Sequence, residues 1–315
     1  MVRALARLRQ AIASAIPPTV PKPSVMHRSL SSSAVSLSSK YYDSQSGRWM
    51  NVPGAAGIRV HDITLAEWKV GCVAPIGKRL DLLETLVAAK PYSVELWAGA
   101  VEEIKRTRWA PDDVHNVNVA ARVHKPEECN HELHRVAAQV VFAGVRCDKS
   151  TLKDDLQRAK AVVKEASDVG LQVRAYVLNA FDGEDEDDNM NHAMATDAIL
   201  NLADYGANLI VISDCKAKAH EDSLRELLEE AFYMDVAGDT MLERLGLRAS
   251  LQSCRIAAKL GVQHFDACLR APAFAHLQGP IADTRELIEM LEAEGKECSV
   301  DSKGLHAFYS AMSKP

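Results

Sequence analysis

Several features are missing from this 315-residue chain, and each absence excludes a class of protein. No run of eighteen apolar residues occurs, so no transmembrane segment is predicted. The seven cysteines are scattered without a C-x-x-C pair, which favours reduced, mostly buried thiols over a disulfide framework or a zinc site. Neither a P-loop nor a G-x-S-x-G motif is present, so an NTPase or a serine hydrolase has no support.

Acidic residues are absent from residues 1–42, which hold six Lys and Arg. MVRALARLRQAIASAI predicts a basic amphipathic helix, a Pro-rich stretch follows, and seven of the eleven residues from Ser29 to Ser39 are serine. This composition is typical of a mitochondrial targeting segment. An extended arm or a disordered basic tail are the alternatives. We expect a location in the matrix, or on the matrix side of the inner membrane, with residues 43–56 as a linker.

The rest of the chain is strongly acidic. Seven of the 37 Lys and Arg lie in residues 1–50, so residues 51–315 hold 30 of them against 42 acidic residues, a net charge near −12. Such a body repels polyphosphates, so no nucleic-acid partner is expected.

Short β-rich runs alternate with helical patterns from Gly57 onward. Seven strands are predicted, at 58–64, 92–98, 117–122, 137–144, 172–179, 208–214 and 264–270. Helices such as 77–89, 150–170, 194–206 and 248–261 lie between them. This order predicts a parallel sheet, and residues 57–315 suit a (β/α)8 TIM barrel of about 250 residues. An eighth strand is expected in an irregular region between Asp214 and Ser250. A doubly wound open sheet is the alternative, but no glycine-rich phosphate loop follows the first strand.

Catalytic residues of such barrels lie at the carboxyl ends of the strands. The polar residues predicted there are Asp62, Glu67, Glu95, Arg122, His124, Asn179, Asp214 and Arg270.

Four blocks of the chain, 150–181, 203–215, 248–271 and 278–295, together with HDITLAEW at 61–68, resemble one family in order and spacing. The family is that of 3-hydroxy-3-methylglutaryl-CoA lyase, a metal-dependent lyase barrel whose first strand ends D-x-T-L-R-D-G. The resemblance implies a divalent metal held by an Asp on strand one, an H-x-H pair on strand seven and an Asn after strand eight. It also implies a catalytic Arg beside that Asp and a Cys in a glycine-rich loop.

This chain departs from the family pattern at most of these positions. Ala66 stands in place of the Arg and Glu67 in place of the metal-binding Asp. Counting back from Gly261 puts the H-x-H pair on Leu242 and Arg244, and the Asn corresponds to Ile281. The Cys loop is shortened to RAPAFAHLQGP, and only Glu95 and Asp214 survive. We therefore expect a barrel without enzyme activity, bound metal or cofactor.

The favoured hypothesis is an accessory subunit of a large mitochondrial complex, in the respiratory chain or the ATP synthase, whose partners are other protein subunits. One alternative is a divergent metal-dependent acyl-CoA lyase that uses Glu67, Glu95 and Asp214. Another is a non-catalytic binder of a CoA thioester. The acidic run 182–188 is expected as a solvated loop, or as a plug of the open end of the barrel, and the histidines of ECNHELH at 128–134 are expected on the surface. Trp109 of KRTRWAPDD at 105–113 is either an exposed anchor for a partner or packs on the barrel.

Overall fold

The computed structural model describes residues 40–43, 48–51, 57–67, 76–96, 99–107, 117–182, 188–214, 216–232, 235–236, 239–269, 281–298 and 300–312. The chain divides into two units, residues 1–38 and 39–315, and all the described residues belong to the second. The predicted amphipathic helix and serine tract lie outside the described residues.

Eight parallel strands close into a barrel, which confirms the predicted (β/α)8 fold and excludes the open sheet. Around the barrel the order is β11-β12-β3-β4-β5-β6-β7-β8. The strands are β3 (Arg59–Asp62), β4 (Ser93–Glu95), β5 (Asn118–Val123), β6 (Gln139–Arg146), β7 (Gln172–Leu178), β8 (Leu209–Ser213), β11 (Leu245–Arg248) and β12 (His264–Ala267).

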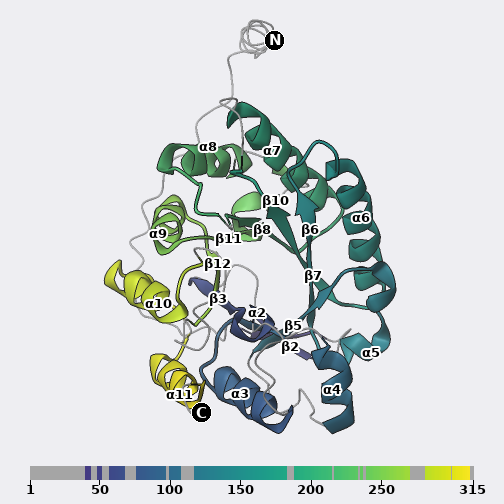
Figure 1. Cartoon of the computed structure of the whole chain (residues 1–315), viewed down its shortest axis with the longest axis vertical. Coiled ribbons are helices and arrows are strands. Elements are labelled where there is room, and N and C mark those ends of the chain that lie inside the picture. Colours follow the sequence, from purple (N-terminus) through teal and green to yellow (C-terminus); the bar gives the residue numbers. More distant parts are fainter. Residues whose placement is uncertain are drawn as a thin grey trace, which may run out of the picture. The chain divides into compact units, whose positions relative to one another are not determined.

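Helices surround the strands, and Figure 1 shows them as an outer ring. They are α3 (Ile76–Ala88), α4 (Ala100–Thr107), α5 (His131–His134), α6 (Leu152–Asp168), α7 (Asp188–Asp204), α8 (Glu221–Phe232), α9 (Leu251–Leu260), α10 (Thr284–Ala293) and α11 (Ser302–Met312). A short helix α2 (Thr64–Glu67) follows β3 directly. No helix in the described part of the chain is long and apolar enough to cross a membrane.

The eighth strand, which was expected between Asp214 and Ser250, is β11, and its four residues lie at the end of that region. Two two-residue strands, β9 (Asp235–Val236) and β10 (Asp239–Thr240), and the 3-10 helix η3 (Met241–Arg244) precede it, so this region is irregular as predicted. A separate antiparallel ribbon pairs β1 (Lys40–Asp43) with β2 (Arg48–Asn51), and it crosses the predicted boundary at residue 42. The 3-10 helix η2 (Pro126–Glu128) completes the described elements.

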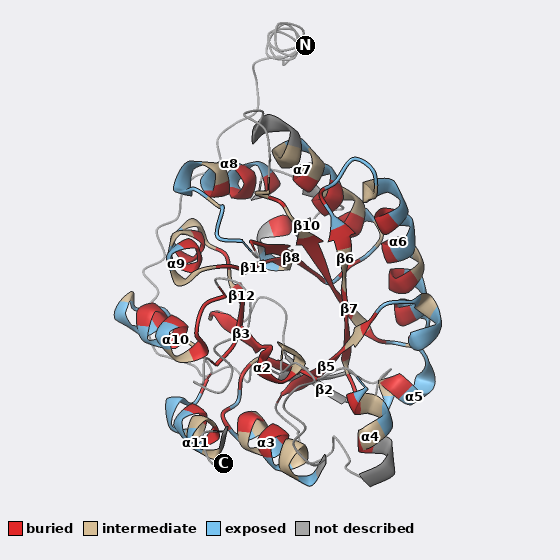
Figure 2. Ribbon diagram, in the orientation of Figure 1, coloured by how far each residue is buried: buried red, intermediate tan, exposed pale blue. Residues whose placement is uncertain are grey.

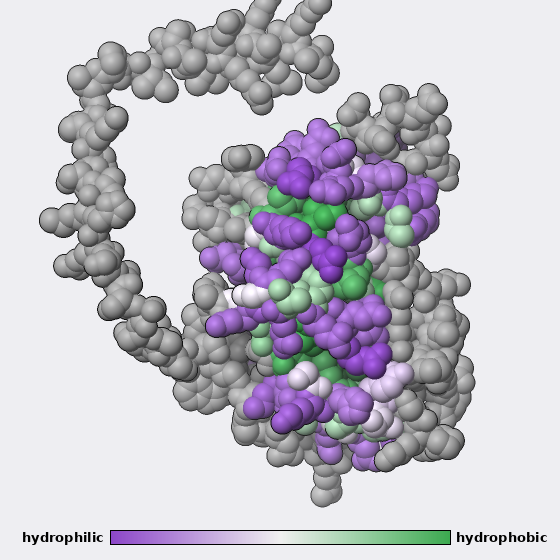
Figure 3. Space-filling view, turned by 90° about the vertical axis from the view of Figure 1, so that its left-hand side faces the viewer, coloured by the Kyte–Doolittle hydropathy of each residue, from purple (hydrophilic) through white to green (hydrophobic). Residues whose placement is uncertain are grey.

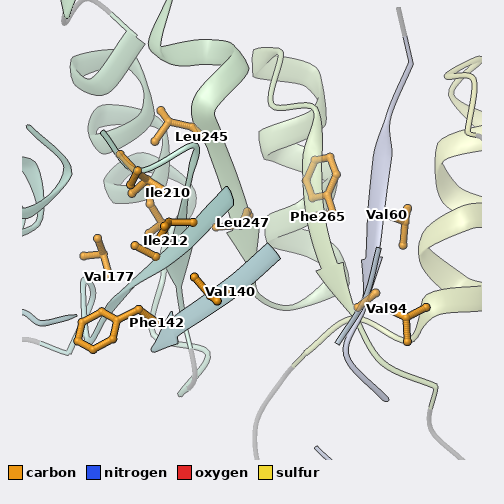
Figure 4. Packing of buried hydrophobic residues seen from close by; sticks show 14 of the residues in the cluster. Val60, Val94, Val140, Phe142, Val177, Ile210, Ile212, Leu245, Leu247 and Phe265 are labelled. Atoms are coloured by element: carbon orange, nitrogen blue, oxygen red, sulfur yellow. The ribbon is translucent and has the colours of Figure 1, made fainter. Parts of the chain in front are cut away.

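The main core lies between the strands and the helices. Successive strand residues point to opposite faces, so every second side chain of the barrel faces outward. Figure 4 labels ten of these, among them Val60, Phe142 and Phe265, and all ten are buried in one apolar cluster with residues of the surrounding helices. Figure 2 shows the same arrangement as buried strands and helices that are buried only on their inner side. Burial of this apolar layer is the main favourable term in folding.

One side of the barrel interior holds a small apolar cluster, next to the inward-facing Arg122 and Arg174. Ala120, Val141, Tyr176, Leu209 and Val211, from β5 to β8, form a small inner cluster. The inward positions of β3, β4, β11 and β12 are instead polar or glycine, and they are Arg59, His61, Ser93, Glu95, Gly246, Arg248, His264 and Asp266. Barrel interiors are more commonly packed with branched apolar residues. Polar side chains buried here need hydrogen-bond or ion-pair partners inside the barrel.

Candidate functional site

The carboxyl ends of the strands carry a network of three carboxylates and three guanidinium groups. Glu95 ends β4 and is fully buried. Its Oε1 accepts from Nε and Nη2 of Arg122 on β5, at 2.9 and 2.6 Å, and its Oε2 accepts from Arg174 on β7. The neighbouring strands therefore hold both oxygens of this carboxylate.

The second carboxylate, Asp266 on β12, lies on the other side of Arg174. Its Oδ1 accepts from Arg174 Nη1 at 3.3 Å, and its Oδ2 accepts from the hydroxyl of Tyr176. Arg174 and Tyr176 are both fully buried, so these contacts are shielded from solvent. Removing one partner of such a buried pair leaves an uncompensated charge, which makes this part of the network structurally demanding.

Glu67 is the third carboxylate of the network, and it contacts Arg122 and Arg248. It ends α2, and its Oε1 lies 3.2 Å from Nη2 of Arg122 and 3.0 Å from Nη2 of Arg248. Arg248 ends β11, and its guanidinium also lies over the ring of Tyr176, 5.8 Å from the centroid. One carboxylate thus joins the first, third and seventh strands of the barrel.

The pKa values of the acids in the network shift in opposite directions. Burial by itself would raise the pKa of Glu67, but the guanidinium groups of Arg248 and Arg122 outweigh it and the pKa lies below its usual range. Glu95 raises the pKa of Arg122. Burial raises the pKa of Asp266, although Arg174 and the Tyr176 hydroxyl act against it.

Asp62 of the HDITLAEW motif makes hydrogen bonds that connect structural elements. It is fully buried, and its carboxylate accepts from the backbone N–H of Thr64 at 2.9 Å and from the Thr284 hydroxyl at 3.0 Å. Thr64 Oγ1 accepts in turn from the backbone N–H of Leu269 at 2.8 Å. Burial raises the pKa of Asp62 to about 6. The D-x-T part of the motif therefore ties β3 to α10 and to the end of β12.

Asp214, the other surviving acid, caps a loop. It follows β8, and its two oxygens accept from the backbone N–H groups of Lys218 and Ala219, at 3.0 and 3.2 Å. Glu67 and Glu95 share Arg122, but within the described part of the chain no contact joins Asp214 to the network.

The two positions counted for the H-x-H pair require a correction. Leu242 and Arg244 lie in η3, before β11 begins, and Arg244 donates to the carbonyls of Ala203 and Ala207 next to the start of β8. These positions are at the amino end of the barrel. Arg248 occupies the carboxyl end of this strand, where the count had put neither residue.

The other predicted positions fall into three groups. Ile281 is buried against Ile63 and Cys268, and Ala66 is part of α2. His131 and His134 lie in α5 as expected, His124 is exposed, and Asn179 follows β7. Most of the acidic run, the Trp109 stretch from 108 to 113 and the shortened loop from Arg270 to Pro280 lie outside the described residues.

A second polar chain runs through the amino half of the barrel. Arg59 Nη1 lies 3.0 Å from Nε2 of His264, whose Nδ1 lies 2.9 Å from Nε2 of His61. His61 Nδ1 lies 2.6 Å from the Ser93 hydroxyl. Burial lowers the pKa of His264 to about 3 and that of His61 well below its usual value, with Arg59 and Arg174 adding to the effect. Both imidazoles are therefore neutral at neutral pH.

Arg174, Arg248, Asp266 and Tyr176 were missed at the sequence level. A usable signal was present, because Arg174 and Asp266 are charged residues inside short β-rich runs. A charge at an inward position of such a strand requires a buried partner.

Comparisons with known proteins agree with this architecture. No family model matches the chain, and no curated protein matches it in sequence. Among solved structures, the HMG-CoA lyase of Brucella melitensis superposes with a TM-score of 0.67 at 16% identity, over 82% of this chain and 98% of that one. Hydroxymethylglutaryl-CoA lyase of Pseudomonas aeruginosa gives 0.67 at 17% identity, over 81% and 92%. The chain has the fold of the HMG-CoA lyases.

The lyase-like barrel is also shared more widely. The carboxyl transferase domain of Rhizobium etli pyruvate carboxylase superposes with a TM-score of 0.59 at 10% identity, over 83% of this chain and 47% of that one. Identities this low establish the fold alone, so the function has to be inferred from the residues at the carboxyl ends of the strands, which form the mouth of the barrel.

The residues at the mouth do not suit the divalent metal that the lyase resemblance implies. Glu67 and Glu95 are engaged by guanidinium groups, and Asp214 is engaged by backbone N–H groups. Within the described residues, no three His, Cys, Asp or Glu side chains form a group that would hold a metal ion. A cation beside Glu67 would also lie close to the guanidinium of Arg248 and be repelled by it.

Proposed function

We propose that this protein is a non-catalytic lyase-like barrel that serves as an accessory subunit of a mitochondrial protein complex. The observation that carries the proposal is the bridging of Glu67 by Arg122 and Arg248. A Lewis acid at this position would need several carboxylate or imidazole ligands. Here the Glu67 carboxylate is instead paired with the guanidinium groups of Arg122 and Arg248.

The mitochondrial part of the proposal rests on composition. Residues 1–42 are basic, serine-rich and free of acidic residues, while residues 51–315 carry a net charge near −12. A targeting segment followed by an acidic globular body is consistent with a protein partner and disfavours nucleic acid. A respiratory-chain or ATP-synthase assembly is the proposed setting.

Metal binding and lyase activity at the mouth are measured with purified full-length protein. Calorimetric titration with Mn²⁺ and Mg²⁺, together with an assay for cleavage of 3-hydroxy-3-methylglutaryl-CoA, should show neither stoichiometric metal binding nor metal-dependent turnover. The matched variant is Glu67→Gln, which keeps the size of the side chain and removes its charge. One equivalent of metal and turnover in the wild type, both lost in this variant, would show that the mouth is an active metal site and that the proposal is wrong.

A further inference from the structure

Two guanidinium groups at the mouth converge on a single point. Nη2 of Arg122 and Nη2 of Arg248 come from strands on different sides of the barrel, yet both lie within 3.2 Å of Oε1 of Glu67. Convergent guanidinium donors are the usual means by which proteins hold carboxylate and phosphate oxygens. The point that Glu67 occupies therefore has the donors of an oxyanion site.

Glu67 is the least firmly held carboxylate of the network. Its side chain is 17% exposed, against 0% for Glu95 and 1% for Asp266. Its contacts to Arg248 and Arg122 are 3.0 and 3.2 Å long, whereas the shortest contact of Glu95 to Arg122 is 2.6 Å. Glu67 is therefore the carboxylate of the network that is most open to exchange with an anion from solvent.

The remaining groups would keep the site in shape without Glu67. Arg122 stays fixed through its two contacts to Glu95, and Arg248 stays above the Tyr176 ring. The side chains of Arg122 and Arg248 are 26% and 10% exposed, so both guanidinium groups keep some contact with solvent.

We propose that the mouth of the barrel is an oxyanion-binding site in which the Glu67 carboxylate is a built-in competitor, and that its ligand is a small carboxylate or phosphate group. The ligand replaces the Glu67 carboxylate between Arg122 and Arg248 and carries a negative charge as Glu67 does. This site requires no metal and does not depend on assembly of the chain into a complex.

The test measures binding of inorganic phosphate and of malonate to the full-length protein by calorimetry, in chloride buffer at constant ionic strength. The wild type should bind one equivalent weakly, and Glu67→Gln should bind it about tenfold more tightly, which corresponds to about 1.4 kcal/mol. Adding Arg248→Gln to this variant should abolish binding. The control Arg225→Gln removes an exposed positive charge on α8, where Arg225 pairs with Glu221 and Glu229, and should leave the affinity unchanged.

Preference for malonate identifies a carboxylate ligand, and preference for phosphate identifies a phosphate ligand; either supports the site. The proposal is overturned if Glu67→Gln binds neither probe saturably or binds no more tightly than the wild type. It is also overturned if adding Arg225→Gln to Glu67→Gln weakens binding as much as adding Arg248→Gln does. If Glu67→Gln does not fold, the wild type decides: a saturable rise in its thermal midpoint with either probe supports the site, and no rise refutes it.

Discussion

Replacing Arg174 with methionine should lower the free energy of unfolding by about 3–5 kcal/mol, the usual cost of breaking a buried ion pair from one side. Arg174 is fully buried and touches both Glu95 and Asp266. Methionine fills a similar volume but leaves Glu95 with Arg122 alone and Asp266 with the Tyr176 hydroxyl. A domain is stable by about 5–15 kcal/mol in total, so the loss is a large fraction of its stability.

Urea denaturation followed by far-UV circular dichroism measures this loss. Adding Glu95→Gln to Arg174→Met removes one of the two carboxylates left without their partner, so the double variant should be more stable than the sum of the single effects predicts. Arg255→Met is the control, because Arg255 is 45% exposed and its pair with Glu294 should contribute about 0–1 kcal/mol. A loss below about 1 kcal/mol for Arg174→Met, or strict additivity in the double variant, would refute the reasoning.

Two further predictions concern helix packing and pH. Gly304→Ala should destabilise the attachment of α11 to α3 by about 1–3 kcal/mol, because the added Cβ would lie 2.6 Å from the Cα of Ala89; a thermal midpoint equal to that of the wild type would contradict this contact. His264→Gln should flatten the acid dependence of stability. The pKa of His264 falls from about 6.5 in the unfolded chain to about 3 in the barrel, so its contribution is complete above pH 6.5 and is lost as the pH falls towards 3. Between pH 6.5 and 5 the wild type should lose about 2 kcal/mol more than the variant, measured by urea denaturation at both pH values; equal losses would show that the imidazole is not held neutral. Asp62, with its pKa raised to about 6, acts in the opposite direction in both proteins and cancels in the difference.

The fold was predictable because its signal is local. The outward positions of the strands are filled by residues such as Val60, Ile210 and Phe265, which alternate with inward residues and stand out as short β-rich runs. The exception is β11, whose sequence is LGLR. Four residues with one glycine give no recognisable strand pattern, and a Cβ at Gly246 would lie 3.2 Å from the Cβ of His264 and 3.3 Å from Cγ2 of Val211.

The mouth was predictable only in part. Glu67 and Glu95 were expected there from the strand ends, and they meet through Arg122. The partners of Arg174 are 79 and 92 residues away in the chain, so no local pattern reveals them. The H-x-H count failed for a different reason. It placed the pair on Leu242 and Arg244, which lie in η3, whereas β11 starts at Leu245 and ends at Arg248.

We propose that the protein is a component of a larger mitochondrial assembly. The most direct measurement is its native size, from blue-native separation of a mild detergent extract of mitochondria with mass spectrometry of each slice. We predict co-migration with an inner-membrane complex of many subunits. Migration as a free monomer or dimer, or absence from the mitochondrial fraction, would contradict the account.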